Sequence, residues 1–186
     1  MDLLKHTYNN LSPYKNHEQK LYKKGDNWYK EIREGYHDDF DIEALRTYIE
    51  VYDFVDPPIM LELKDGVFRY ECRDLSKTHK QLIDISYKHQ IKILGKLLSE
   101  VMHSFLEFSE ARGKTDIPTP NNPTGKKVFC HRDLAFHNIY VAGDDIKLLD
   151  IDSFMWTNRG DFKSYYQYTL LRLAQHFDNW TLLSTF

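Results

Sequence analysis

The chain has 186 residues, 41% of them hydrophobic and 15% aromatic, which is enough to bury a core as one domain or as two small lobes. A formal net charge of −3 argues against a nucleic-acid-binding surface, and no apolar run approaches the roughly 18 residues of a membrane-spanning helix. The two cysteines form no CxxC motif and residues 1–10 hold no secretory apolar segment, so the sequence predicts a cytoplasmic protein with reduced thiols.

Two β-hairpins are predicted in the first part of the chain. Residues 20–32 read as two short strands around the turn residues Gly25-Asp26-Asn27. Residues 59–64 and 67–72 flank Asp65-Gly66, a dipeptide typical of two-residue hairpin turns. The sequence therefore predicts a small antiparallel sheet.

One helix is predicted between the hairpins, at residues 39–54. Either Asp39 or Asp41 can cap its N-terminus, and Pro57-Pro58 ends the helical pattern. Its apolar residues fall near helical spacing, at Ile42, Leu45, Ile49 and Tyr52. Glu43 lies in the first turn, where a carboxylate complements the helix dipole.

The longest periodic segment runs from residue 78 to residue 110 and predicts a long helix, interrupted near residues 87–89. Its apolar stripe is broad and indicates a core-facing helix: Leu82, Ile85, Ile91, Leu94, Leu98, Val101, Phe105 and Phe108. Residues 111–127 contain three prolines and two glycines, which is typical of a surface connection.

Three short strands are predicted at residues 128–130, 139–141 and 146–151. The first leads into a loop that begins with His131-Arg132-Asp133, and Gly143-Asp144-Asp145 supplies a turn between the other two. Polar residues therefore gather where these strands end.

Asp133, Asn138 and Asp150 are the residue types that phosphoryl transfer requires. A loop carboxylate such as Asp133 can orient the attacking hydroxyl or accept its proton. The amide oxygen of Asn138 and the carboxylate of Asp150 are hard ligands suited to Mg²⁺. The alternative is a plain β-meander in which His131 is a core histidine and the other three residues belong to turns and caps.

The pattern H-R-D-L-x-x-x-N, from His131 to Asn138, and the later I-K-L-L-D, ending at Asp150, resemble the catalytic loop and metal-binding strand of the protein-kinase superfamily. The D-F-G of protein kinases is replaced here by Asp150-Ile151-Asp152. This ending is similar to those of lipopolysaccharide-core sugar kinases, spore-coat kinase-like proteins and aminoglycoside or choline kinases.

The resemblance implies an α+β, minimal two-lobed kinase-like fold, with residues 1–74 as a sheet-containing N-lobe and residues 75–186 as a truncated helical C-lobe. It also implies that Asp133 is the catalytic aspartate, assisted by His131 and Arg132, and that Asn138 and Asp150 hold Mg²⁺. Arg132 would bind a phosphate in a regulated protein kinase, and here it can instead pair with a nearby acid.

On the nucleotide side, the resemblance implies that Lys30 holds the ATP phosphates, although a solvent-facing strand lysine is the alternative. Glu43 is the expected partner of Lys30, with Glu50 as its rival. The backbone at Glu71, Cys72 and Arg73 would meet the adenine. The chain departs from the family pattern because no glycine occurs from residue 3 to residue 24, where a phosphate loop is expected.

These features predict a Mg-ATP-dependent phosphotransferase that acts on a hydroxyl of a sugar, a glycan or another small acceptor. Peripheral membrane contact is compatible with this function. The alternatives are a compact protein kinase acting on Ser, Thr or Tyr, and a nucleotide-binding module without turnover. Residues 153–160 are expected to form a short loop, after which Asp161 caps a helix. The resemblance implies that Asp161 braces the backbone of the catalytic loop.

Overall fold

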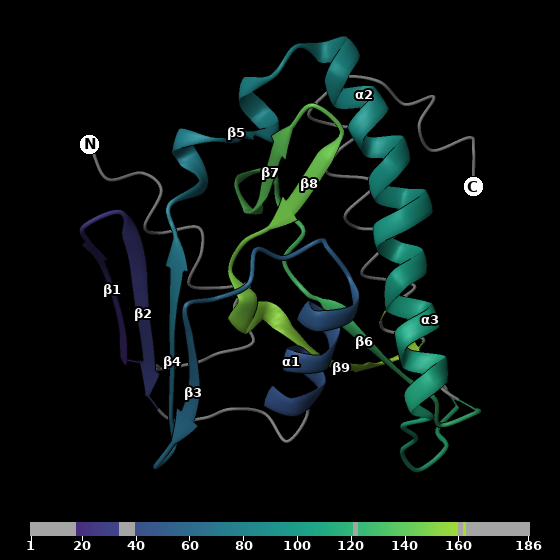
Figure 1. Ribbon diagram of the computed structural model, residues 1–186. Helices are drawn as coiled ribbons and strands as arrows, with labels where there is room; N and C mark the ends of the chain where they lie inside the picture. The colour runs from purple at the N-terminus through teal and green to yellow at the C-terminus, as the bar shows by residue number, and fades with distance from the viewer. Residues whose placement is uncertain (1–17, 34–39, 121–122, 160–161, 163–186) are drawn as a thin grey trace. The chain divides into compact units, whose positions relative to one another are not determined.

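The computed structural model describes residues 18–33, 40–120, 123–159 and 162. The chain forms two compact units (Figure 1): unit 1 comprises residues 1–38 and 57–74, and unit 2 comprises residues 39–56 and 75–186. The predicted N-lobe of residues 1–74 differs from unit 1 because residues 39–56 pack with unit 2. The chain is an α+β protein in both its sequence pattern and its structure.

Unit 1 is a four-stranded antiparallel sheet in the order β1-β2-β4-β3. Its strands are β1 (Glu18–Lys24), β2 (Asn27–Arg33), β3 (Met60–Lys64) and β4 (Val67–Arg73). Both predicted hairpins are present. Gly25 has φ 61° at the first position of its two-residue turn, and Asp65 and Gly66 have φ 53° and 71°, which are the positive values that tight hairpin turns require.

Unit 2 begins with α1 (Ile42–Val51), the predicted helix. Of the two candidate caps, Asp41 is the one used, since its Oδ1 accepts a hydrogen bond from the Ala44 N–H at 3.0 Å. The side chain of Tyr48 is fully buried. Its ring contacts four aromatic rings of unit 2, and these contacts explain why α1 belongs there: Phe105, Phe108, Phe129 and Phe154.

The predicted long helix begins later than expected. Residues 87–112 form α2 (Tyr87–Lys96), a π-helical turn (Leu97–Val101) and α3 (Met102–Arg112), which Gly113 ends with φ 62°. Residues 75–84 instead form two 3₁₀ turns and the short strand β5 (Lys80–Gln81). Pairing of β5 with a distant strand overrides the local helical spacing there.

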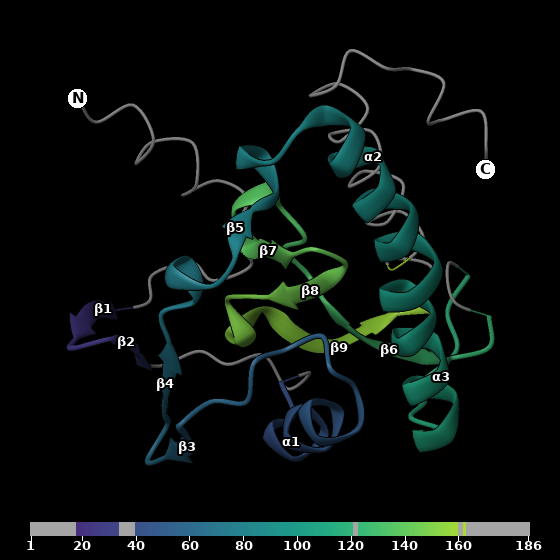
Figure 2. The same ribbon diagram turned by 45° about the horizontal axis from the view of Figure 1, so that its top comes forward.

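The remaining strands of unit 2 are β6 (Lys127–His131), β7 (Ile139–Ala142), β8 (Asp145–Leu148) and β9 (Phe154–Asn158). β7 and β8 form the predicted antiparallel pair, and β5 adds to the free edge of β7. The expectation of a loop at residues 153–160 was wrong, because β9 pairs with β6 along its whole length and α3 packs on β6 (Figure 2). Phe154 and Trp156 of β9 enter the aromatic core.

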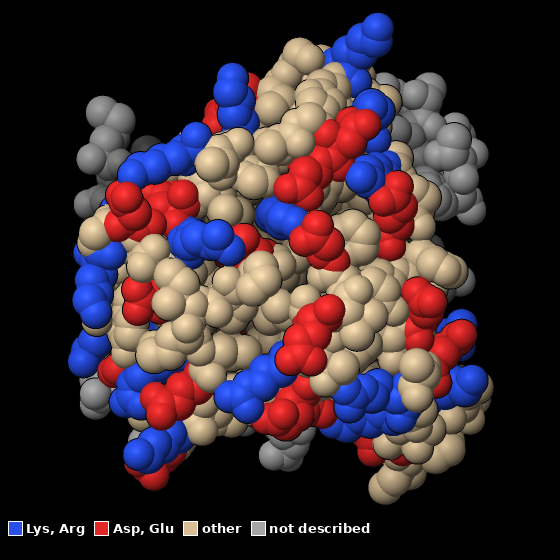
Figure 3. Space-filling view, in the orientation of Figure 1, with Lys and Arg blue, Asp and Glu red and all other residues tan. Residues whose placement is uncertain are grey.

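Lysine, arginine, aspartate and glutamate side chains alternate over the face shown in Figure 3 without a large field of one sign. No helix within the described residues is long and apolar enough to cross a membrane.

Candidate functional site

The loop between β6 and β7 is held in place by His131, the last residue of β6. The His131 side chain is buried, its Nδ1 accepts the Asp133 N–H at 3.1 Å, and its Nε2 lies 2.6 Å from the Leu149 carbonyl oxygen. Because a backbone N–H can only donate and a carbonyl can only accept, Nδ1 carries no proton and Nε2 carries one. The ring thus connects the start of the loop to the residue before Asp150 and holds the loop in place.

Burial lowers the pKa of His131, although the hydrogen bond to Leu149 and the charges of Asp150 and Asp133 act in the opposite direction. The imidazole therefore stays neutral at pH values where an exposed histidine gains a proton.

This burial predicts a pH dependence of stability. An unfolded histidine binds a proton as the pH falls below about 6.5, whereas folded His131 resists it, so the free energy of unfolding should decrease as the pH falls from there. The slope from one such group is at most about 1.4 kcal/mol per pH unit. In thermal melts from pH 7 to pH 5, His131→Gln should flatten the dependence of Tm on pH. His103→Gln, at an exposed position, should leave it unchanged. Equal slopes in the wild type and His131→Gln would contradict the assignment.

Asn138 contacts Asp133 directly. Its Nδ2 donates to the Asp133 carbonyl oxygen at 2.9 Å and to Asp133 Oδ2 at 3.0 Å. The amide orientation is dictated by chemistry, because the carbonyl oxygen can only accept. Asn138 is only 6% exposed, and its Oδ1 has no hydrogen-bond partner among the residues described. A buried polar atom in this state is unusual and indicates a ligand site.

Asp150 has a left-handed backbone with φ 57° and ψ 54°. This conformation costs about 1–3 kcal/mol for a residue other than glycine, although aspartate tolerates it better than most residues. Ser153 stabilises the turn, since its N–H donates to the Asp150 carbonyl oxygen at 2.8 Å and its Oγ donates to Asp150 Oδ2 at 3.3 Å. The Leu149 N–H donates to the Asn138 carbonyl oxygen at 2.8 Å, which places the backbone leading to Asp150 beside Asn138.

Two further polar side chains belong to this loop. The guanidinium of Arg132 donates to the sulfur of Met155 at 3.2 Å, and within the described residues it forms none of the expected ion pairs with a nearby acid. His137, which the sequence reasoning missed, brings its Nε2 to 3.9 Å from Asp133 Oδ2. The spacing of four residues between Asp133 and His137 is the signal that could have identified it.

The residues around Asp133 can supply only part of the ligand set of a Mg²⁺ ion. In the described part of the chain, no group of three or more His, Cys, Asp and Glu side chains could hold a metal ion by itself. Mg²⁺, however, usually takes one or two carboxylates together with water and substrate phosphates. The unpaired Oδ1 of Asn138 and the carboxylate of Asp150 are ligands of the types found in such a partial set.

In unit 1, Lys30 lies on the apolar face of the sheet. The register places it in one row with Leu21, Tyr70 and Leu61, and Lys30 is only 7% exposed. The alternative of a solvent-facing lysine was therefore wrong. Its neighbour Glu31 points to the opposite, charged face, where it pairs with Arg69 at 2.9 Å.

The expected adenine-contacting segment is the end of β4. The Glu71 carbonyl oxygen accepts the Ile59 N–H at 2.7 Å, and its carboxylate accepts the Asn27 Nδ2 at 2.8 Å. Cys72 is half-buried and forms no disulfide with the other described cysteine, Cys130, and Arg73 is exposed. Contact of these three residues with adenine stays a prediction.

Glu43 opens α1 with a side chain that is 71% exposed and 2.6 Å from the Arg46 guanidinium. Its rival Glu50 is also exposed. Glu43 belongs to unit 2 and Lys30 to unit 1, so their pairing stays a prediction. Asp161 lies outside the described residues, as does most of the segment without glycine.

No protein-family model and no curated protein matches this sequence. Functional inference therefore rests on the residues and contacts described above.

Proposed function

We propose that the chain is a Mg-ATP-dependent phosphotransferase with a minimal two-lobed kinase-like fold, which transfers the γ-phosphate to a hydroxyl of a sugar, a glycan or another small acceptor. The observation that supports this function best is the contact between Asn138 and Asp133, which leaves Asn138 Oδ1 buried and unpaired. An asparagine with a purely structural role in a turn would be expected to have its buried side-chain oxygen hydrogen-bonded within the protein.

In this proposal Asp133 orients the acceptor hydroxyl and takes up its proton. Its side chain is 37% exposed, so an acceptor can reach it, and Asn138 holds one of its oxygens. His131 positions this loop through its two hydrogen bonds. Mg²⁺ bound with ATP would neutralise charge on the phosphates, and Asn138 and Asp150 would hold it.

Unit 1 would bind the nucleotide. Lys30 is a cation within an apolar sheet face, the setting in which an ammonium group interacts strongly with phosphate. Leu21 and Trp28 lie on the same face and are 62% and 40% exposed, which leaves apolar surface for a purine ring.

A small acceptor is favoured over a protein acceptor by the Asp150-Ile151-Asp152 ending, which is similar to that of sugar and small-molecule kinases and differs from the D-F-G of protein kinases.

The metal-dependent part of the proposal is tested by thermal stability. Saturating Mg-ATP should stabilise the wild type, by about 2.7 kcal/mol at a hundredfold excess over Kd, and EDTA should remove most of that gain. Asp150→Asn should abolish the metal-dependent part, since asparagine tolerates the left-handed backbone but carries no charge. Asp144→Asn, in the exposed turn between β7 and β8, should respond like the wild type. A shift that is unchanged by EDTA would refute the metal assignment.

A further inference from the structure

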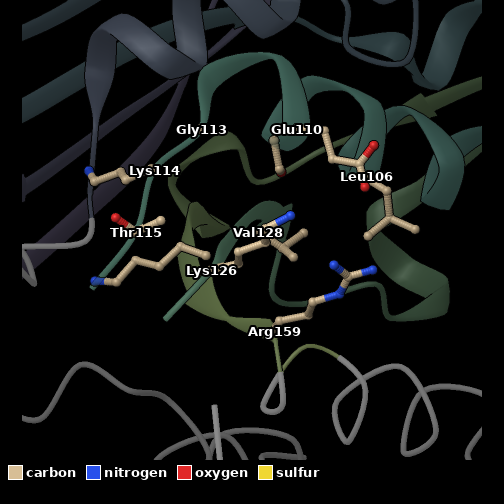
Figure 4. Close-up of a pocket in the computed structure, with 10 residues that line it drawn as sticks. Leu106, Glu110, Gly113, Lys114, Thr115, Lys126, Val128 and Arg159 are labelled. Atoms are coloured by element: carbon tan, nitrogen blue, oxygen red, sulfur yellow. The ribbon is translucent and has the colours of Figure 1, made fainter. Parts of the chain in front are cut away.

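A cavity lies in unit 2, near the Lys127 end of β6. It has a volume of about 360 Å³ and is lined by the last turns of α3, the residues that follow it, the start of β6 and Arg159 (Figure 4). Lys127 and His131 are the two ends of this five-residue strand, so about 13 Å of extended chain separates the cavity from the catalytic loop. The proposed phosphotransfer makes no use of this cavity.

Four cationic residues line the cavity, and backbone pairing brings them together from three segments. The Lys127 N–H donates to the Lys114 carbonyl oxygen at 3.0 Å, and the Arg159 N–H donates to the Lys126 carbonyl oxygen at 3.1 Å. The segments approach so closely that a Cβ on Gly125 would lie 2.2 Å from the Asp116 carbonyl oxygen. Main-chain contacts therefore hold together the three segments that carry these cations.

Acids compensate these cations only in part. Lys127 pairs with Asp116 at 3.1 Å, Lys114 lies 3.6 Å from Asp41, and Glu110 also lines the cavity. The guanidinium of Arg159 forms no ion pair with any described residue. Like charges gathered in this way repel one another, so a bound anion would relieve the repulsion.

The cavity also has an apolar wall, formed by Leu106 and the buried Val128. Figure 4 shows Arg159 extending towards this wall, with Lys114 and Lys126 on the other side. A pocket of a few hundred Å³ that combines apolar surface with a few charged groups is the usual form of a small-molecule site.

We propose that this cavity binds a small organic anion, in which a phosphomonoester or carboxylate group meets Arg159 and an apolar portion packs on Leu106 and Val128. Arginine suits this role because its planar fork can donate two parallel hydrogen bonds to a carboxylate or phosphate. The site is independent of the phosphotransfer proposal.

Equilibrium binding to the full chain at low ionic strength tests this site with four probes: 1-naphthyl phosphate, 1-naphthoate, neutral 1-naphthol and inorganic phosphate. No nucleotide is present, because a nucleotide is itself an organic phosphate that would compete for this cavity; the variants described next distinguish this cavity from the proposed nucleotide site. We expect 1-naphthyl phosphate or 1-naphthoate to bind at least tenfold more tightly than 1-naphthol and inorganic phosphate, because only these two combine charge with an apolar body. Stronger binding of 1-naphthyl phosphate would identify phosphomonoesters as the class, and stronger binding of 1-naphthoate would identify carboxylates.

Arg159→Gln should weaken binding of the better probe about tenfold, on the scale of a charge-assisted hydrogen bond. Leu106→Ala should weaken it by a similar factor without changing the response to inorganic phosphate. Lys92→Gln removes an exposed lysine elsewhere in unit 2 and should leave binding unchanged. Equal weakening by Lys92→Gln, no effect of Arg159→Gln, or binding of all four probes with the same affinity would overturn the proposal. Each of these outcomes leaves the metal-dependent effect of Asp150→Asn untouched.

Discussion

Asp133→Asn is expected to lower phosphate transfer about a hundredfold or more, while the affinity for Mg-ATP changes little. The substitution keeps the size of the side chain and removes the charge that allows it to accept a proton. The amide oxygen of the new side chain can still accept the hydrogen bond that Asn138 Nδ2 donates to Asp133 Oδ2. The loop geometry should therefore survive, so that the loss reports on proton acceptance rather than on folding.

The measurement pairs turnover with binding. Transfer from labelled ATP is followed with glycan fractions, small alcohols and protein extracts as acceptors, and nucleotide affinity is measured by titration of the same preparations. Asp144→Asn makes the same charge change in an exposed turn of unit 2 and serves as the control. A wild type that binds Mg-ATP but transfers phosphate to no acceptor would make the protein a nucleotide-binding module. Loss of nucleotide binding in Asp133→Asn would instead mean that Asp133 holds the metal.

The elements that were predicted well from the sequence are those determined by residues close together in the chain. The turn at Asp65-Gly66 needs two positive φ values that these residue types accept, and the cap at Asp41 needs only a hydrogen bond to Ala44. β9 was not predicted because the strand depends on pairing with a distant segment: Trp156 pairs with Phe129, 27 positions earlier. Apolar residues after a turn do not by themselves identify a partner strand. The same holds for β5, whose pairing with β7 replaced a predicted turn of helix.

The candidate site was predicted as a set of residues but not as an arrangement. Spacing singled out Asp133 and Asn138, yet nothing local indicates that the amide would face the aspartate and leave its own oxygen unpaired. The left-handed backbone of Asp150 and the approach of His137 to Asp133 depend on hydrogen bonds from several segments. The cavity with its cationic lining could not be predicted from the sequence for the same reason. The segments that carry Lys114, Lys126 and Arg159 are brought together only by backbone hydrogen bonds between distant positions.

Tyr48→Ala is expected to lower the free energy of unfolding of unit 2 by about 3–5 kcal/mol, as is typical when a large aromatic side chain is removed from a core. Tyr48 is 0% exposed, and its ring centre lies 5.2 Å from that of Phe154 and 5.5 Å from that of Phe108. Its hydroxyl lies 2.7 Å from Ser104 Oγ, and burial raises its pKa. A loss of this size is a large fraction of the 5–15 kcal/mol that stabilises an ordinary domain.

Tyr48→Phe separates the contribution of the hydroxyl group to stability from that of the aromatic ring. Ser104 Oγ already donates to the Val101 carbonyl oxygen at 2.7 Å, so the Tyr48 hydroxyl is the donor in their shared hydrogen bond. Removing it leaves Ser104 bonded, and the cost should be about 1 kcal/mol. Val51→Ala, at a position of the same helix that is 63% exposed, should change stability by less than about 0.5 kcal/mol.

Urea denaturation followed by tryptophan fluorescence measures these losses in unit 2. The chain has three tryptophans, and Trp28→Phe with Trp180→Phe leaves Trp156, whose ring lies 5.4 Å from that of Phe129 in the same aromatic cluster. In that background Tyr48→Ala should shift the Trp156 transition to lower urea, and Val51→Ala should not. If Tyr48→Ala left the Trp156 transition in place, α1 would not belong to the core of unit 2. The helix that carries Glu43 would then be free to move separately from the loop that carries Asp133.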